Sequence, residues 1–287
     1  MIGELERLSR DSGWHISSIA KEENGVWCLP SAVPVHYPDE GRAVCAGAEE
    51  KSPWFQHRNQ VLARLFQRTG GLPPALWEIG SGNGWVAAFF QQRGVDVVAV
   101  EPDAGGARLA VQRGVCSVCG TLEQLKLPAS SIPSVGCFDV IEHLADPEPL
   151  LREIFRVLRP GSRVALSVPA FQALWSQTDE VSGHFRRYSR RSLCELMGRL
   201  GFLRLHSEYM MCSLVPPLIV SRVLPDRLGR RVVPDACMKE CGRQLVPSSQ
   251  LVRGLLTSAL SLEYHVSGFL PLPWGTSLVG VFAKPAS

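Results

Sequence analysis

Short apolar runs alternate with helix-patterned segments through the middle of the chain. The runs predict strands, and the segments between them predict helices. The predicted strands lie near residues 76–80, 95–100, 115–119, 134–141 and 163–168, and the predicted helices at 84–93, 103–113, 148–158 and 190–200. Because strands separated by helices are typical of βα repeats, we expect an α/β core with a mainly parallel sheet and right-handed crossovers.

The same pattern divides the chain into four parts. An amphipathic segment leads into the core, which we place at residues 51–209. The alternation then stops, and residues 210–268, with prolines at 216, 217, 225, 234 and 247, predict an inserted helical lid or substrate subdomain. Within residues 269–287, "GTSLVGVF" predicts a strand that returns to the core sheet. Residues 1–50, rich in Gly, Pro and Glu, predict an irregular N-terminal extension.

Composition excludes several classes of protein. With 45% hydrophobic and 20% charged residues, the 287-residue chain is neither disordered nor fibrous. Its formal net charge of +3 is too small to indicate nucleic acid by itself. The cysteines are odd in number and scattered, the N-terminus is charged where a signal peptide needs an apolar stretch, and no apolar run is long enough to span a membrane. We therefore expect a cytoplasmic protein without a nucleic-acid partner.

A glycine-rich loop follows the first predicted strand. In "WEIGSGNGWVAAFF", Gly80, Gly82 and Gly84 separate an apolar run from a helical pattern. Such a turn presents free backbone N–H groups and a helix N-terminus to a ligand. Glu101 ends the next strand, at a spacing where a carboxylate can accept both hydroxyls of a ribose. Trp85 stands where the dinucleotide fingerprint needs glycine or alanine, which disfavours pyrophosphate; a plain tight turn is the alternative interpretation.

Several motifs in the core resemble those of class I S-adenosylmethionine-dependent methyltransferases. They are "EIGSGNG", "VAVEP", "GCFDVIEHLADPEPLLREIFRVLRPGSRVALSVPAFQALWS" and "DEVSGHFRRYSRRSL", and the chain is most similar to the bacterial branch with "FDVIEH" and "GHFRRY" segments. The resemblance covers residues 50–205 and the closing "LPWGTSLVGVFAKP". It implies a Rossmann-like sheet of seven strands whose last strand is antiparallel, and S-adenosyl-L-methionine as the cofactor. Ser162 departs from the family, which often has a second glycine there.

The resemblance also implies cofactor-binding residues, position by position. Glu78, Gly80 and Gly82 would border the methionine part of the cofactor, and Glu101 the ribose. The turn after the third strand would border the adenine, and the end of the fourth strand would lie near the sulfonium. These two groups are Thr121, Leu122 and Glu123 for the adenine, and Cys137, Phe138 and Asp139 for the sulfonium.

Two histidines fall at the carboxyl end of the predicted sheet, where open α/β folds bind ligands. His143 follows the fourth strand, and His184 lies in "DEVSGHFRRYS" after the fifth. Methyl transfer mainly requires alignment, but a hydroxyl or protonated amine acceptor also needs a base, and imidazole titrates in the useful range. Each histidine is a candidate catalytic base, and a structural hydrogen bond that braces a loop is the alternative for each.

Candidate substrate-binding residues come from three segments. Guanidinium groups pair well with carboxylate or phosphate, so the arginines of "GHFRRYS" are compatible with an anionic acceptor. Aromatic side chains near residue 54 and in "ALWSQTD" could wall an acceptor pocket, with ordinary core packing as the alternative. The substrate-binding candidates are Arg186, Arg187, Tyr188, Trp54, Phe55 and Trp175.

The insertion and the cysteines leave further alternatives open. Between residues 222 and 253 basic side chains outnumber acidic ones, and "LVPPLIVSRVL" is apolar but too short to span a bilayer. A lid over the active site is the first interpretation, and contact of residues 210–231 with a membrane surface is the second. "CSVC" has metal-ligand spacing but lies within a predicted strand and has no second pair, so we expect no metal.

The sequence therefore predicts an enzyme, an S-adenosylmethionine-dependent methyltransferase. Its expected reaction is in-line methyl transfer to an oxygen or nitrogen of a small-molecule or lipid-linked metabolite. The fold does not identify the acceptor. One alternative is an NAD(P)-dependent oxidoreductase on a related sheet, and another is a catalytically silent cofactor-binding scaffold subunit. A nucleic-acid acceptor would need a broad basic face with stacking aromatics, which the sequence does not indicate.

Overall fold

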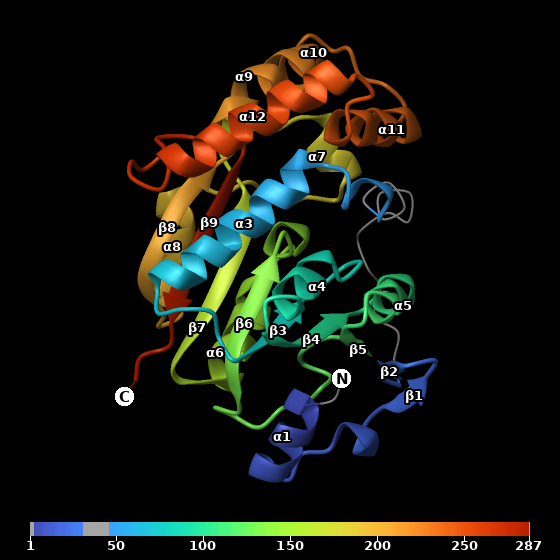
Figure 1. The fold of residues 1–287 in the computed structure, drawn as a ribbon, viewed down its shortest axis with the longest axis vertical. Coiled ribbons are helices and arrows are strands. Elements are labelled where there is room, and N and C mark those ends of the chain that lie inside the picture. The colour runs from blue at the N-terminus through green and yellow to red at the C-terminus, as the bar shows by residue number, and fades with distance from the viewer. Residues whose placement is uncertain (1–2, 31–45, 287) are drawn as a thin grey trace.

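The computed structural model describes residues 3–30 and 46–286, so part of the predicted N-terminal extension and residue 287 lie outside the described residues. One sheet has the strand order β1-β2-β5-β4-β3-β6-β7-β9-β8 (Figure 1). Its strands are β1 (Lys21–Glu23), β2 (Val26–Cys28), β3 (Ala75–Ile79), β4 (Asp96–Glu101), β5 (Cys116–Cys119), β6 (Ile132–Phe138), β7 (Leu158–Pro169), β8 (Leu203–Met210) and β9 (Ser277–Ala283).

The central strands β5, β4, β3, β6 and β7 are parallel to one another, as their alternation with helices predicts. β9 lies between β7 and β8 and is antiparallel to both, which confirms the expected antiparallel last strand. Apolar residues alternate between two cores along these strands: Trp77 and Ile79 belong to one and Leu76 to the other. The sequences of these strands are nearly continuous apolar runs because both faces of the sheet are buried.

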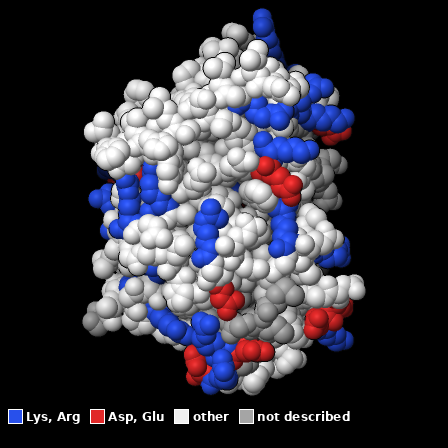
Figure 2. Space-filling model, in the orientation of Figure 1, with Lys and Arg blue, Asp and Glu red and all other residues white. Residues whose placement is uncertain are grey.

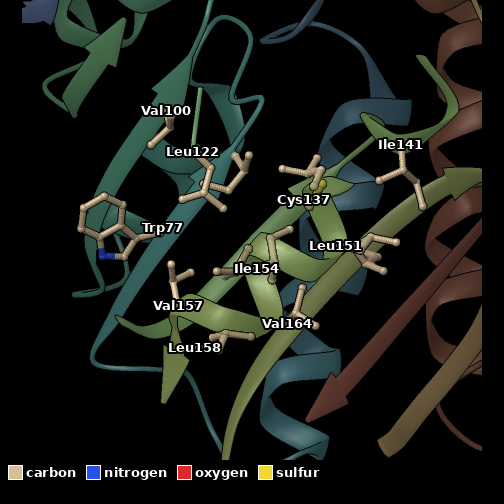
Figure 3. Close-up of a cluster of buried hydrophobic side chains, with 14 of the residues drawn as sticks. Trp77, Val100, Leu122, Cys137, Ile141, Leu151, Ile154, Val157, Leu158 and Val164 are labelled. Atoms are coloured by element: carbon tan, nitrogen blue, oxygen red, sulfur yellow. The ribbon is translucent and has the colours of Figure 1, made fainter. Parts of the chain in front are cut away.

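Helices cover both faces of this sheet (Figure 1). On one face α3 (Pro53–Arg68), α4 (Trp85–Gln91) and α5 (Ala104–Gln112) contribute to one buried cluster. On the other, α1 (Gly3–Ser12), α6 (Glu148–Val157) and α8 (Arg190–Arg199) contribute to the second. Figure 3 shows part of this second cluster, where Leu151, Ile154 and Val157 of α6 pack toward the strands.

The helices begin where the sequence supplies capping groups. Pro53 occupies the first turn of α3, where its missing N–H costs no hydrogen bond. The Asp103 side chain accepts a bond of 2.6 Å from the Gly106 N–H at the start of α5. At α8, Ser189 Oγ accepts a bond of 3.0 Å from the Ser192 N–H. These caps fix the start of α5, which follows β4, and the start of α8, which precedes β8.

The sheet differs from the seven-stranded prediction because it has two additional strands. β1 and β2 form an antiparallel hairpin, and β2 pairs in parallel with β5 at the sheet edge. With α1, this hairpin also corrects the expectation of an irregular segment over residues 1–50. The prediction failed here because β1 and β2 are each only three residues long, and β1 is exposed throughout. Such short strands have too few positions to display a period.

The insertion is helical. It comprises α9 (Val215–Leu218), a π-helical turn η5 (Ile219–Val223), α10 (Leu224–Arg227), α11 (Pro234–Leu245) and α12 (Gln250–Val266). These helices lie across the end of the molecule toward which β6 points (Figure 1). Among the described residues, none of these helices, nor any other, has the length and apolar character needed to cross a membrane.

Candidate active site

A cavity of about 1060 Å³ lies between the carboxyl ends of the parallel strands and the insertion. Loop residues 80–83, Glu101 and Asp139 line it from the strands. The 3-10 turn η4 (Cys212–Leu214) and α9 contribute apolar residues on one side and α12 on the other, among them Leu218 and Leu256. Small-molecule sites usually occupy roughly 300–1,000 Å³, so this cavity has room for a cofactor and an acceptor together.

The glycine loop connects β3 to α4 at the edge of this cavity. Gly80 has φ +70°, and a Cβ there would lie 2.5 Å from Val140 Cγ2, so both the backbone and the close packing require glycine. Glu101 holds the loop from the neighbouring strand: its Oε2 accepts from the Gly82 N–H at 2.7 Å, and its Oε1 from the Asp103 N–H at 2.9 Å. Both oxygens of Glu101 thus hold the backbone around the loop, and Glu101 also lines the cavity.

Glu78 precedes the loop and is only 2% exposed. Its Oε2 has no hydrogen-bond partner among the described residues. Burial raises the pKa of Glu78 to about 8, against the opposing charge of Arg58. A buried carboxylate that borders the cavity is suited to a cationic ligand group, such as the ammonium of a bound amino acid.

Asp139, directly after β6, forms an ion pair of 2.6 Å with Arg58 of α3. The backbone of Asp139 has φ +56°, an uncommon conformation for a residue other than glycine. Arg58 also lies over two aromatic rings of its own helix, 5.0 Å from the centroid of Trp54 and 5.2 Å from that of Phe55. The α3 helix therefore carries a cation and two aromatic side chains to the cavity wall.

His143 and His184 meet in the wall of the cavity. Their ring centroids are 4.6 Å apart and the rings are nearly perpendicular. His143 ends the 3-10 turn η2 (Ile141–His143), and burial followed by the nearby His184 lowers its pKa to about 4. His184 Nδ1 lies 2.9 Å from Oδ1 of Asp179 in α7 (Gln177–Val181). His143 is therefore neutral near pH 7, whereas His184 has a carboxylate partner.

Asp179 is held as a carboxylate by two neighbours. Arg187 donates to it through Nε at 2.7 Å and Nη2 at 3.0 Å. Burial acts to raise the pKa of Asp179, but the bonds with His184 and Arg187 outweigh it and hold that pKa below its usual range. Because an ionised carboxylate only accepts hydrogen bonds, the His184 Nδ1 must donate, and in the neutral imidazole with this tautomer Nε2 is the acceptor.

Glu142 lies next to the two histidines and is buried. Its Oε2 has no hydrogen-bond partner among the described residues, and burial, followed by the charge of Asp139, raises the pKa of Glu142 well above its usual range. One donor atom each from Glu142, His143 and His184 lies within 4.8 Å of the others. These three side chains are the possible ligands of a metal ion, although the sequence analysis predicts no metal site.

Twelve of the predicted site residues line the cavity. They are Trp54, Phe55, Glu78, Gly80, Gly82, Glu101, Thr121, Phe138, Asp139, His143, His184 and Arg187. Thr121 marks the turn after β5, at the end of the cavity beside Glu101 and Pro102. The predicted positions thus converge from segments that are distant along the chain.

Six predicted residues do not line the cavity. Leu122, Cys137 and Tyr188 are buried in the core instead. Glu123 is exposed, Arg186 donates to the Ala145 carbonyl, and the Trp175 indole donates to Glu180 at 3.4 Å. The sequence neighbours of Leu122 and Cys137, Thr121 and Phe138, line the cavity, so the turn and the strand end border it while these two side chains point into the core.

The sequence interpretation missed Arg58, Asp179 and the residues of the insertion that line the cavity. Arg58 lies three and four residues after Phe55 and Trp54, so helical spacing could have placed it on the same face. It also missed Glu49, which accepts bonds from Asn83 at 3.1 Å and Arg113 at 2.8 Å and thereby closes the cavity beside the glycine loop. No local pattern marks Glu49.

Comparison with known proteins identifies the family. A family model described as a methyltransferase domain matches residues 54–207. A probable S-adenosylmethionine-dependent methyltransferase of Mycolicibacterium smegmatis is 32% identical over 178 residues, covering 61% of this chain and 67% of that protein. An uncharacterized methyltransferase of Mycobacterium tuberculosis is 33% identical over 127 residues, 43% of this chain, and the chain covers 46% of its length. The chain belongs to this methyltransferase-domain family.

Solved structures show the same fold. Phosphoethanolamine N-methyltransferase 2 of Haemonchus contortus, in complex with S-adenosyl-L-methionine, superposes with a TM-score of 0.55 at 19% identity, over 87% of this chain and 58% of that one. Together with the family match, the site defines an S-adenosylmethionine-dependent methyltransferase whose cofactor is S-adenosyl-L-methionine. The oxidoreductase and scaffold alternatives are not favoured by these matches.

Proposed function

We propose that the protein transfers a methyl group from S-adenosylmethionine to an oxygen or nitrogen of a small-molecule or lipid-linked acceptor, with His184 as the base. The observation that carries this proposal is the 2.9 Å contact between His184 Nδ1 and Asp179 Oδ1, at the wall of the cavity that also contains the glycine loop. A base oriented by a carboxylate is thereby present in the same space as the cofactor site.

Residues of the strand ends fit the cofactor. Glu78 offers a buried carboxylate oxygen for the ammonium of the methionine part, and Glu101, which lines the cavity at the end of the next strand, would contact the ribose. Thr121 borders the cavity where we place the adenine. Phe138 and Asp139 border it on the side of His143 and His184, where the sulfonium and the acceptor would meet. In this assignment Leu122, Glu123 and Cys137 shape the site through the backbone alone.

The chain's own contribution to the reaction is alignment and proton removal. The sulfonium supplies a methyl group that is already activated. His184 Nε2 would accept the proton of an acceptor hydroxyl as the methyl group is transferred, or would first take the proton of an ammonium group so that its nitrogen has a free electron pair. S-adenosylmethionine, when bound, would supply the methyl group and leave as S-adenosylhomocysteine. Asp179 stabilises the protonated imidazole, and Arg187 keeps Asp179 ionised and in place.

The acceptor pocket combines apolar walls with basic groups from the insertion. Arg187, predicted to bind an anionic acceptor, is paired with Asp179, and Arg186 does not reach the cavity. Arg222 and Arg243 do line it, on the side of the insertion. An acceptor with an apolar body and an anionic group would therefore be held by these two arginines rather than by the predicted pair.

The substitution His184→Asn tests the base. We expect turnover to fall by roughly 10²- to 10⁴-fold, because the proton acceptor is lost, while the affinity for S-adenosylmethionine is retained. Turnover is measured by mass spectrometry, as transfer of a deuterated methyl group from the cofactor to compounds in a cell extract. His15→Asn, outside the cavity, is the matched control. Equal turnover in the His184 variant would remove this residue from the mechanism.

Dialysis against a chelator tests whether His184 acts as a base or as a metal ligand. If His184 acts as the base, dialysis against EDTA leaves turnover unchanged. Loss of turnover after dialysis, restored by a stoichiometric divalent cation, would instead assign Glu142, His143 and His184 to a metal site.

A further inference from the structure

Large exposed apolar side chains gather on one part of the molecule. Among the described residues, only three large apolar side chains are exposed outside residues 220–274, namely Phe185, Leu203 and Leu205. All the others lie on the insertion or on the segment that joins α12 to β9. Scattered single apolar residues are normal on a protein surface, but a contiguous group of this kind marks an interaction surface.

Two helical stripes form this surface. Val220, Leu224 and Leu228 are exposed at intervals of four residues along η5 and α10. α12 forms the second stripe through Leu251, at 81% exposure, and Leu255, at 72%, and continues to Leu262. Both intervals match one face of a helix, so each stripe is continuous.

α12 is apolar on both of its sides. Its inner side packs on the core through the buried Leu260 and the partly buried Leu256. Its one acidic residue, Glu263, is buried and accepts hydrogen bonds from Ser213 at 3.0 and 2.9 Å. Arg253 of α12 is half-buried and donates to the Pro247 carbonyl at 3.1 Å. The exposed side of α12 thus carries the leucines together with small polar residues and His265, and it is not covered in the described structure. A surface helix normally has a polar outer face, so the leucines of α12 require another explanation.

Basic side chains border the apolar surface. Arg227, Arg230, Lys239 and Arg243 are exposed on α10, on α11 and in the loop between them. Figure 2 shows a broad white area over the insertion with blue atoms gathered along its upper right edge. Asp226, on the same segment, is paired with Arg231 at 2.8 Å, and Glu240 of α11 is paired with Arg243 at 3.6 Å, which leaves Arg227, Arg230 and Lys239 as the main basic groups of the border. The border is thus complementary to anionic headgroups.

The cavity opens on this same surface. Val252 and Leu255 both line the cavity and are exposed, so its mouth lies beside the α12 stripe. Leu218 and Ser221 line it from the other stripe's side. Beyond α12, Phe269 is 90% exposed and Trp274 52%. Large aromatic side chains of this kind are favoured at the boundary between lipid tails and headgroups.

We propose that the apolar surface of residues 220–274 docks on a lipid bilayer that contains anionic phospholipid, and that the cavity takes its acceptor from that membrane. The protein lies on the bilayer rather than across it, with the leucines and Phe269 in the interface and the basic residues among the headgroups. The acceptor part of this inference rests on the proposed function, since it names a membrane lipid or lipid-linked molecule as the methylated class. The docking itself does not depend on the proposed function.

Flotation with vesicles tests the docking. The purified full chain is expected to float with vesicles of phosphatidylglycerol and phosphatidylcholine, and to bind them at least about tenfold more tightly than vesicles of phosphatidylcholine alone. The exposed pair Leu255→Glu and Phe269→Glu should reduce binding by at least about tenfold. Leu203→Glu with Leu205→Glu is the matched control, because these leucines are also exposed but lie on β8.

Three outcomes would overturn the docking: no flotation with either vesicle, equal flotation of the Leu255/Phe269 variant, or loss of flotation in the β8 control. A dimer in analytical ultracentrifugation that the Leu255/Phe269 substitutions dissociate, without vesicle binding, would assign the surface to a second copy. Calorimetric titration with S-adenosylmethionine keeps the two proposals separate. Vesicle binding without cofactor binding would support the docking and reject the proposed function. Cofactor binding without vesicle binding would support the proposed function and reject the docking.

Discussion

At the scale of single residues, the buried Glu78 makes the stability of the protein depend on pH. Its pKa is raised to about 8, so between the ordinary value of 4.5 and 8 the folded state binds more protons than the unfolded state. The stability of the cofactor-free protein is therefore expected to decrease as pH rises through this range. A bound ammonium would supply the opposite charge and offset this loss.

Glu78→Gln removes the titrating group and tests this pH dependence. Above pH 8 the cofactor-free variant should be more stable than the wild type by about 3–5 kcal/mol, and below pH 4.5 the difference should disappear, since the carboxyl is then neutral in both states. Urea unfolding across this pH range measures it, and calorimetry should show weaker binding of S-adenosylmethionine. Glu123→Gln, at an exposed position, is the control. If the difference in unfolding free energy between this variant and the wild type did not change with pH, the raised pKa of Glu78 would be contradicted.

Several residues could be identified from local sequence and others could not. Gly80, Gly82 and Glu101 were predictable because a glycine loop and an acid one strand later form a recognisable spacing. Asp179 was not, because it reaches His184 and Arg187 from a short helix with no pattern that distinguishes one carboxylate from its neighbours. The direction of a side chain also depends on the surrounding core, as Leu122 and Cys137 show.

At the scale of elements, the loop between β3 and α4 is expected to tolerate no side chain at Gly80. In Gly80→Ala the Cβ would meet Val140 at 2.5 Å in addition to the strain of φ +70°. We expect a loss of more than about 2 kcal/mol in unfolding free energy and a loss of cofactor binding. Urea unfolding and calorimetry with S-adenosylmethionine provide the two readouts.

Gly94→Ala is the control for this loop. Gly94 has φ +81°, but a Cβ at this position would have nothing within 4 Å, so the substitution brings the backbone strain without the collision. It should lose only about 1–2 kcal/mol and keep its cofactor affinity. Equal effects at the two positions would show that the packing against Val140 is unimportant.

The same scale explains which elements could be predicted. The parallel strands and their helices are predictable because each strand is a short apolar run that ends in a turn. β8 escaped the residue pattern, since its first three residues are exposed and its apolar residues do not alternate regularly. It is a strand because β9 pairs with it along its length at the sheet edge.

At the scale of the whole molecule, Arg64 connects the insertion to the core. It forms an ion pair of 2.7 Å with the buried Glu208 of β8 and donates to Ser267 Oγ at 2.8 Å and to the Tyr264 carbonyl of α12. Arg68 and His206 are the other partners of Glu208, so its charge is not left alone when Arg64 is removed.

Arg64→Ala is therefore expected to lower the unfolding free energy by about 2 kcal/mol and to increase amide hydrogen exchange in α12 before the core strands. Urea unfolding and exchange mass spectrometry measure the two effects. Arg191→Ala is the matched control, because its pair with Glu195 is exposed and screened by water and should contribute little to the unfolding free energy. A variant with unchanged exchange in α12 would show that the insertion is held by its apolar contacts alone.

The sequence by itself determined the α/β core and the glycine loop, because these depend on apolar periodicity and on residues close together along the chain. It indicated the class of enzyme through the resemblance of its motifs to those of a known family. The tertiary structure decided which side chains face one another across the cavity, since Arg58 and Asp139 are 81 positions apart. It also decided the position of the apolar stripes of the insertion. Only the folded chain shows that they surround a cavity mouth and remain exposed.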